Sequence, residues 1–353
     1  MERNLTTGNI GKTIAYFALP YLLSYFLQTL YGMADLFIIG QFDGVDGITA
    51  VSNGGQVMHM LTVIIVGLAM GTTVTIGKSV GAGKLDAASV SIGNTVTFFM
   101  GMSVVVMAVL VFLVNPIVTL IGIPAEAVAG TRQYLFVCFL GIPFITAYNV
   151  ISAIFRGLGD SQSPMYFIAI ACVANIVLDY VFIGGLGMGP IGAALGTTLA
   201  QTISVIISLI AIRRKETGIH LTKKELRVKR DVLGQILKIG IPVAVQDGCI
   251  QVAFIVISVI ANHRGLNDAA AVGVVEKLIG MIFIVPSSML ATVSALSAQN
   301  IGAGRHDRAR KLLYYAILIT GRLYFVDCDL CGSVYLDAEI NAWRAKCDVI
   351  KIS

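Results

Sequence analysis

The feature that most constrains this chain is a series of long apolar stretches almost without charge. Between Ile14 and Gly40 the only ionised side chain is that of Asp35, and none occurs between Ser89 and Pro124. A helix needs about 20 apolar residues to cross a bilayer core, and both stretches are long enough. Only 13% of the 353 residues are charged, whereas soluble domains carry about 25%. The sequence therefore predicts an all-α integral membrane protein.

Glycine and proline residues divide the apolar stretches into eight predicted membrane-spanning helices, followed by the start of a ninth near residue 312. Prolines inside these stretches are tolerated because neighbouring helices satisfy the freed backbone groups. The eight spans are predicted at residues 14–39, 50–77, 91–114, 131–155, 164–184, 190–212, 232–261 and 271–298.

Basic residues are distributed unevenly between the two sides that this helix order defines. With the N-terminus in the cytoplasm, 17 lysine and arginine residues lie on the inner side, and only Arg132 and Arg264 on the outer side. Cytoplasmic loops carry such an excess, so we expect a multi-pass protein of the cell membrane with a cytoplasmic N-terminus. The densest basic group lies in a polar linker at residues 213–231. We interpret it as a topology signal in contact with membrane lipid, not as a nucleic-acid site.

An internal repeat relates the parts of the chain on either side of this linker. The segment GKSVGAGKLDAA at residues 77–88 resembles AQNIGAGRHDRA at residues 298–309, and both follow an even-numbered predicted helix. Two parallel six-helix repeats are therefore expected, as in transporters with two like halves. The predicted organisation is an N-lobe at 1–212 with six helices, the linker, and a partial C-lobe at 232–321 with two helices and the start of a third.

The last 32 residues, 322–353, differ in composition from the rest of the chain. They contain nine charged residues, three of the six cysteines and the only tryptophan, Trp343. We interpret this polar tail as the product of a frameshift or misassembly, which leaves the second repeat incomplete. The alternative is a Cys-x-x-Cys site at Cys328 and Cys331, although no further metal-ligand pattern accompanies it.

Four polar residues in the first repeat are expected to share one level of the membrane. Asp35 and Asp179 lie near the outer ends of the first and fifth predicted helices, and Thr197 lies seven residues into the sixth. At 1.5 Å per residue, the three reach a similar depth in the outer half. Asn175 precedes Asp179 by four residues, which places both on one helix face.

The chemistry of these four side chains suits a small cation. Ionisable groups inside membranes are costly and are functional candidates by default. Two neighbouring carboxyl groups in a low-dielectric medium cannot both ionise cheaply, so the pair can hold a proton. With the amide and hydroxyl oxygens beside them, they can equally hold a sodium ion. The alternative is a structural hydrogen-bond network that braces three helices.

Three further polar residues are candidates for contact with a substrate inside the membrane, namely Gln28, Asp247 and Gln251. Asp247 in the second repeat can meet a cationic molecule, or it can be solvated locally. The chain has no P-loop and no dinucleotide fingerprint, and its four histidines have no metal-ligand spacing. We therefore predict neither an enzyme nor a bound cofactor, with a proton or sodium as the coupling ion.

Several of these features together resemble the multidrug and toxic compound extrusion (MATE) family. They are the two repeats, Pro20 in the first helix, the repeated Gly-Ala-Gly segment, and the sequence Arg-Gly-Leu-Gly-Asp at residues 156–160 followed by Pro164. The resemblance extends from residue 10 to about residue 320. It implies export of organic cations and drugs in exchange for protons or sodium, by rocking of two lobes.

The resemblance also implies roles for particular residues. Asp35, Asn175, Asp179 and Thr197 match the family's ion-coupling residues in the N-lobe, and Gln251 takes the place of a glutamate that some members have in helix seven. The family has twelve helices, of which this chain would supply eight and a fragment. The alternatives are a flippase for lipid-linked oligosaccharides, which shares the architecture, and a non-functional remnant. A basic cavity lined by arginines would favour the flippase, and no intramembrane arginine cluster is visible.

Overall fold

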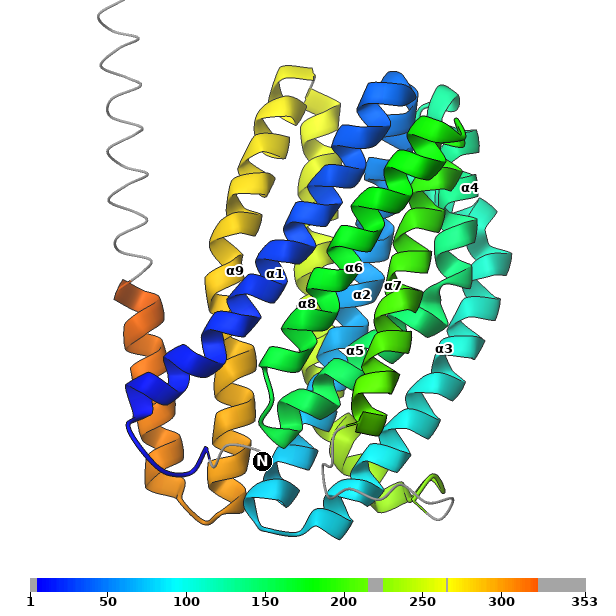
Figure 1. Cartoon of the computed structure of the whole chain (residues 1–353). Coiled ribbons are helices and arrows are strands. Elements are labelled where there is room, and N and C mark those ends of the chain that lie inside the picture. Colours follow the sequence, from blue (N-terminus) through cyan, green and yellow to red (C-terminus); the bar gives the residue numbers. More distant parts are fainter. Residues whose placement is uncertain (1–4, 215–224, 265, 323–353) are drawn as a thin grey trace, which may run out of the picture.

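The computed structural model describes residues 5–214, 225–264 and 266–322, and every regular element among them is a helix. The helices form an upright bundle (Figure 1). Their bounds are α1 (Ile10–Phe42), α2 (Gly44–Gly81), α3 (Leu85–Ile121), α4 (Ala125–Leu140), α5 (Ile142–Leu158), α6 (Gln162–Asp179), the π-helix η1 (Tyr180–Gly185), α7 (Gly189–Arg214), α8 (Arg230–Arg264) and α9 (Leu266–Gly302). A further helical stretch covers residues 306–322, and the predicted polar tail lies otherwise outside the described residues.

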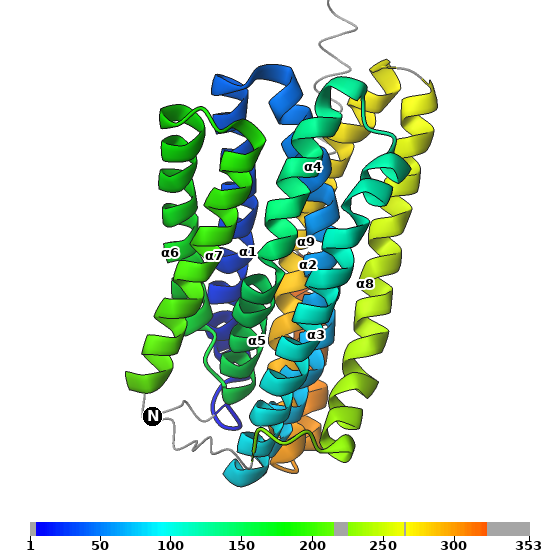
Figure 2. The same cartoon turned by 90° about the vertical axis from the view of Figure 1, so that its right-hand side faces the viewer.

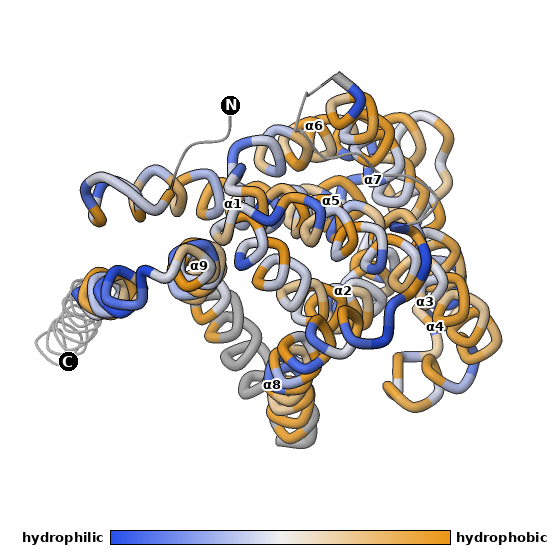
Figure 3. Tube along the Cα trace, turned by 90° about the horizontal axis from the view of Figure 1, so that it is seen from below, coloured by the Kyte–Doolittle hydropathy of each residue, from blue (hydrophilic) through white to orange (hydrophobic). Residues whose placement is uncertain are grey.

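The predicted all-α membrane fold is confirmed by the length and composition of these helices. Among the described residues, seven helical spans are long and apolar enough to cross a membrane, and there are eight if the bent pair of α4 and α5 counts as one span. Large apolar side chains on the outside of the bundle, such as Phe112 and Leu120 on α3, are more than 80% exposed. A water-soluble surface does not carry so many exposed apolar side chains. Figure 3, seen from below, shows that apolar residues occur on most of the helices.

Two of the predicted spans were wrong in detail. The span expected to end at residue 114 continues through Asn115 and Pro116 and ends at Ile121, before Gly122, whose φ of 68° suits glycine. Proline does not end this helix because helices in a membrane tolerate it. The span expected as one helix at 131–155 is broken at Gly141, where α4 and α5 meet at an angle of 51°. Pro143 lies in the first turn of α5. Proline has no backbone N–H, and at this position an N–H would have no hydrogen-bond acceptor within the helix.

Helix α2 lies at the centre of the bundle and contacts helices on both sides. It packs against α4 and α5 on one side and against α8 and α9 on the other, as the two perpendicular views show (Figures 1 and 2). Helix α2 thereby makes most of the contacts between the predicted N-lobe, which contains α1 to α7, and the predicted partial C-lobe, and α1 also packs against α9. The division into these lobes stays a prediction.

Glycines allow α2 to approach α8 and α9 closely. A side chain at Gly71 would meet the carbonyl oxygen of Ile236 on α8, and one at Gly81 would meet the carbonyl oxygen of Gln299 on α9. Gly302 on α9 in turn lies against Lys78 on α2. Small residues are the usual means by which membrane helices bring their backbones together. The contacts lie toward the end of the bundle where α1 begins (Figure 1).

The close contact between α2 and α8 generates the first prediction. Gly71→Ala should lower the free energy of unfolding by about 1–3 kcal/mol, because the added methyl group forces the two helices apart. Gly55→Ala on the same helix is the matched control, since a methyl group there meets no atom within 4 Å. Thermal unfolding of both variants in detergent measures the difference. Equal stability of the two variants would contradict the packing described here.

Candidate functional site

The candidate site lies where α1, α6 and α7 contact one another in the half of the bundle away from the start of α1. Asp35 comes from α1, Asn175 and Asp179 from the last turns of α6, and Thr197 from α7. These helices pass side by side, so residues far apart in the chain reach one level. The structure brings together all four residues that the sequence predicted to share a depth.

The four side chains form a connected polar cluster inside the bundle. Thr197 Oγ1 donates to Asp35 Oδ2 at 3.3 Å, and Asn175 Nδ2 donates to Asp179 Oδ2 at 3.5 Å. The carboxyl groups of Asp35 and Asp179 are themselves close enough for a hydrogen bond when one of them is protonated. Asp179 is fully buried, Asn175 is 2% exposed and Asp35 is 5% exposed. The carboxylates therefore face each other with little access to solvent.

The cluster contains more acceptors than donors. One oxygen of each of Asp35, Asn175 and Asp179 is buried and has no hydrogen-bond partner. A buried acceptor without a partner costs about 1–3 kcal/mol, and more when it is charged. Hydrogen-bond networks that only brace helices normally satisfy their members. The unpartnered oxygens therefore indicate a site that is completed by something the protein binds.

The backbone around Asp179 is shaped for this arrangement. A side chain at Gly196 on α7 would meet Asp179 Oδ1, so glycine is required for α7 to pass this close to the carboxyl group. Directly after Asp179 the chain continues as the π-helix η1. Short π-helical segments in membrane and soluble proteins occur frequently at functional sites because they re-aim side chains and backbone groups.

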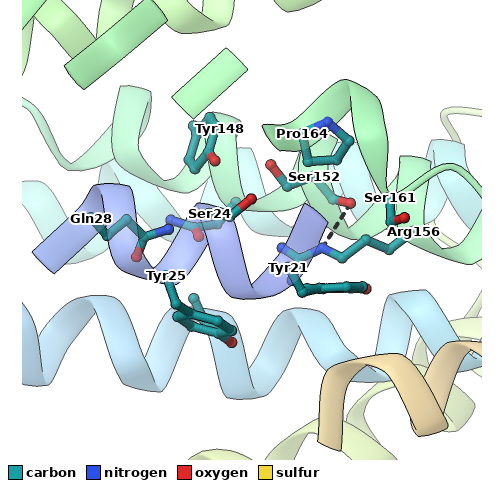
Figure 4. Close-up of a pocket in the computed structure, with 11 residues that line it drawn as sticks. Tyr21, Ser24, Tyr25, Gln28, Tyr148, Ser152, Arg156, Ser161 and Pro164 are labelled. Carbon is teal, nitrogen blue, oxygen red and sulfur yellow. Dashed lines mark hydrogen bonds between the residues drawn. The ribbon is translucent and has the colours of Figure 1, made fainter. Parts of the chain in front are cut away.

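A second polar group lies nearer the start of α1 and lines a cavity of about 40 Å³ (Figure 4). Gln28, one of the predicted substrate residues, is part of its wall. Asp247 on α8 is half-buried and does not line this cavity. Gln251 lies one turn further along α8, is half-buried, and is not among the lining residues.

Of the residues that line this cavity, sequence reasoning predicted only Gln28, and the charged residue that it missed is Arg156. Its place near a predicted helix end assigned it to the basic residues of the inner side, whereas the structure turns its side chain into the cavity. The sequence did contain a signal, because Tyr148, Ser152 and Arg156 follow one another at steps of four residues. Residues at this spacing share one face of a helix, and all three line the cavity.

Comparison with known proteins identifies the family. The sequence matches the MatE family model over residues 20–181 and 242–326. The chain belongs to the MatE family. This assignment makes it a membrane transporter and not an enzyme, in agreement with the predicted fold and with the resemblance in its sequence motifs.

Two relatives of this MatE protein occur in Bacillus subtilis (strain 168). The probable multidrug resistance protein YpnP is 29% identical over 306 residues, which cover 86% of this chain and 68% of the relative. The probable multidrug resistance protein YoeA is 26% identical over 316 residues, which cover 88% of this chain and 68% of the relative.

A solved structure confirms the fold. A multidrug resistance MATE family transporter in an outward-facing conformation superposes with a TM-score of 0.81 at 24% identity, over 89% of this chain and 70% of the other. Because the sequence identity is only 24%, the superposition establishes the arrangement of the helices and nothing beyond it.

The surplus of acceptors in the cluster generates the second prediction. Asp179→Asn should raise the free energy of unfolding by about 1–3 kcal/mol, because the amide removes one buried charge and supplies a donor to the facing carboxylate. Thermal unfolding in detergent at neutral pH measures this gain. Asp86→Asn, at an exposed position in the first turn of α3, is the control and should give no gain. A loss of stability in Asp179→Asn would contradict the excess of acceptors.

Proposed function

We propose that this MatE protein is a secondary active antiporter that exports organic cations and drugs in exchange for protons or sodium. The names of both Bacillus relatives, probable multidrug resistance proteins, support small-molecule drugs as substrates. The observation that carries the proposal is the buried pair of Asp35 and Asp179, whose cluster holds three unpartnered oxygens. A transporter of drugs requires an energy source, and this cluster is suited to bind an ion.

Either coupling ion would complete the cluster. A proton placed between Asp35 and Asp179 removes one charge and turns one carboxyl oxygen into a donor for the other. A sodium ion would instead take oxygen ligands from both carboxyl groups, the Asn175 amide and the Thr197 hydroxyl group. Ions bound at such places in transporters lie at irregular or discontinuous helices, and η1 follows Asp179 directly. Binding and release of the ion would change the net charge of the cluster once per transport cycle.

The proposed orientation places the N-terminus in the cytoplasm of a cell-membrane protein. The basis is the excess of lysine and arginine in the segments on the side of the N-terminus. The cluster at Asp35 then lies in the outer half of the membrane. Exchange with ions from outside the cell requires such a position.

The proposed mechanism is alternating access between two lobes. At the cytoplasmic end, Gln299 Nε2 on α9 donates to the carbonyl oxygen of Gly157 on α5 at 3.0 Å. Arg308 donates to the carbonyl oxygens of Gly8 and Thr7 at 2.7 and 2.9 Å, which ties the segment after α9 to the start of the chain. These contacts and the glycine contacts of α2 hold the cytoplasmic ends together. Opening toward the cytoplasm requires all of them to separate.

The role of the carboxyl pair generates the third prediction. Asp35→Asn should reduce ethidium efflux from cells that express the chain at least tenfold, because the neutral amide can neither exchange a coupling proton nor supply a charged oxygen ligand to sodium. Asp46→Asn is the matched control, since Asp46 is exposed in the first turn of α2, and it should retain efflux. Efflux that is equal in Asp35→Asn and in the unchanged chain would remove Asp35 from the mechanism.

The two-lobe mechanism generates the fourth prediction. Gly77 and Ala298 face each other between α2 and α9, with their Cβ positions 3.1 Å apart. A Gly77→Cys, Ala298→Cys pair should therefore form a disulfide under oxidation. In a background without the native cysteines, this crosslink should stop ethidium efflux, and reduction should restore it.

The control for the crosslink is the pair Gly55→Cys, Ala298→Cys. Gly55 lies 22 residues before Gly77 on the same helix, about 33 Å along its axis, so this pair should not react. Full efflux from a completely crosslinked Gly77→Cys, Ala298→Cys protein would rule out separation of α2 from α9 during transport.

A further inference from the structure

A large basic cavity lies between α2, α3 and α8, at the end of the bundle where α8 begins (Figure 2). Its volume is about 780 Å³, which is within the roughly 300–1,000 Å³ of sites for small organic ligands. Three lysines line it, namely Lys78 on α2, Lys229 directly before α8 and Lys238 on α8. None of its lining residues belongs to the Asp35 cluster or to the cavity around Arg156.

The positive charge of this cavity has no counterpart in its walls. Among the described residues that line it, none is acidic. The acids nearest in sequence to the walls are Asp86 and Asp231, which are exposed in the first turns of α3 and α8 and do not line the cavity. Cationic side chains gathered around one space repel one another, and a bound anion would offset this repulsion.

The lysines and Gln235 are the wall residues whose side chains can donate hydrogen bonds to a ligand. The other polar wall residues carry hydroxyl groups that already donate to carbonyl oxygens of their own helices, and they are Thr75, Ser79 and Ser91. An ammonium group has three donors and no acceptor. The cavity is therefore suited to a ligand group with several acceptor oxygens and a negative charge, such as a phosphate.

The wall at Lys229 is part of the packed structure. The backbone N–H of Lys229 donates to Oδ1 of Asn94, a fully buried residue of α3. A side chain at Gly93 would meet the carbonyl oxygen of Glu225, so the segment before α8 lies in backbone contact with α3. The position of Lys229 is thus set by this contact, although its side chain is exposed.

The depth of the lysines favours a ligand that is part of the membrane. Lys78 lies in the last turn of α2, and Lys238 lies eight residues after Arg230, the first residue of α8, or about 12 Å along the helix axis. A lysine at such a depth extends its charged end toward the membrane surface. Apolar side chains line the cavity beside the lysines, and they are Val90, Val232 and Ile239. A phospholipid presents a phosphate and hydrocarbon together, whereas a free phosphate presents no apolar surface.

We propose that this cavity binds the headgroup of an anionic phospholipid, with the phosphate at Lys78, Lys229 and Lys238 and the acyl chains against the apolar wall. Basic pockets between membrane helices on the cytoplasmic side hold such headgroups. In the proposed orientation the lipid belongs to the inner leaflet. It would contact the predicted N-lobe through α2 and α3 and the predicted partial C-lobe through α8. Binding of this lipid does not depend on the proposed antiport.

Native mass spectrometry of the purified full chain in detergent tests the proposal. Dioleoylphosphatidylglycerol and dioleoylphosphatidylcholine have the same acyl chains and differ in their headgroups, so they form a matched pair. The unchanged chain should bind the anionic lipid at least about tenfold more tightly, because each lysine near its headgroup adds attraction. Glycerol phosphate, which lacks acyl chains, should not displace dioleoylphosphatidylglycerol when both are present at equal concentration.

Substitutions assign this preference to the cavity. Replacement of all three lysines, Lys78→Gln, Lys229→Gln and Lys238→Gln, should abolish the preference for the anionic lipid. Replacement of the same three by arginine should keep it, because the positive charge is retained. If the triple glutamine variant does not fold, each single substitution should reduce the preference severalfold.

The matched control removes the same charge elsewhere. Lys12→Gln, Arg310→Gln and Lys311→Gln change exposed residues that do not line the cavity. This triple variant should retain the full preference for dioleoylphosphatidylglycerol. Loss of the preference in the control would attribute it to net charge and overturn the proposed site.

The remaining outcomes separate the lipid from other ligands and from ion coupling. Equal binding of the two lipids, or an undiminished preference in the triple glutamine variant, would overturn the proposal. Displacement of the lipid by glycerol phosphate would assign the cavity to free phosphate and likewise overturn it. Asp35→Asn should leave the lipid preference in place, so the result is independent of the ethidium efflux that tests the antiport.

Discussion

The absence of water from the bilayer core is the constraint on which the rest of this structure depends. Each backbone polar group must be satisfied within the protein, and helices satisfy their own. Polar side chains follow the same rule by donating to the carbonyl oxygen four residues earlier, as Thr75 does to Gly71 at 2.8 Å and Thr131 to Ala127 at 2.9 Å. Of the twelve buried side-chain atoms that lack a partner among the described residues, six belong to the Asp35 cluster or the Arg156 cavity. Half of the exceptions to the rule thus lie at these two places.

Close helix packing brings helices into contact around the polar atoms at these two places. At Gly196 the missing side chain lets α7 reach the Asp179 carboxyl group, and at Gly71 it lets α2 lie against the backbone of α8. The same packing joins helices of the two proposed lobes, because α2 contacts α8 and α9. A rigid contact of this kind has discrete arrangements and does not deform continuously.

The two polar groups differ in the charge of their side chains. The Asp35 cluster has an excess of acceptors and suits a small cation, whereas the cavity nearer the start of α1 contains the positive charge of Arg156. The family assignment shows that the chain is a transporter. The charges of these side chains are the basis for the ions and molecules that we expect it to bind.

The sequence by itself determined the eight spans, the face shared by Asn175 and Asp179, and the common depth of Asp35, Asp179 and Thr197. These properties depend on the hydropathy of consecutive residues and on the regular repeat of the α-helix. Both can be derived from the order of residues in the sequence. Only the tertiary structure decided that α4 and α5 break at Gly141, that Gly196 lies against Asp179, and that Arg156 turns into a cavity with Tyr21. These depend on how each helix is rotated and tilted against its neighbours. That rotation is set by the packing of side chains from distant segments, which no periodicity within a single helix reports.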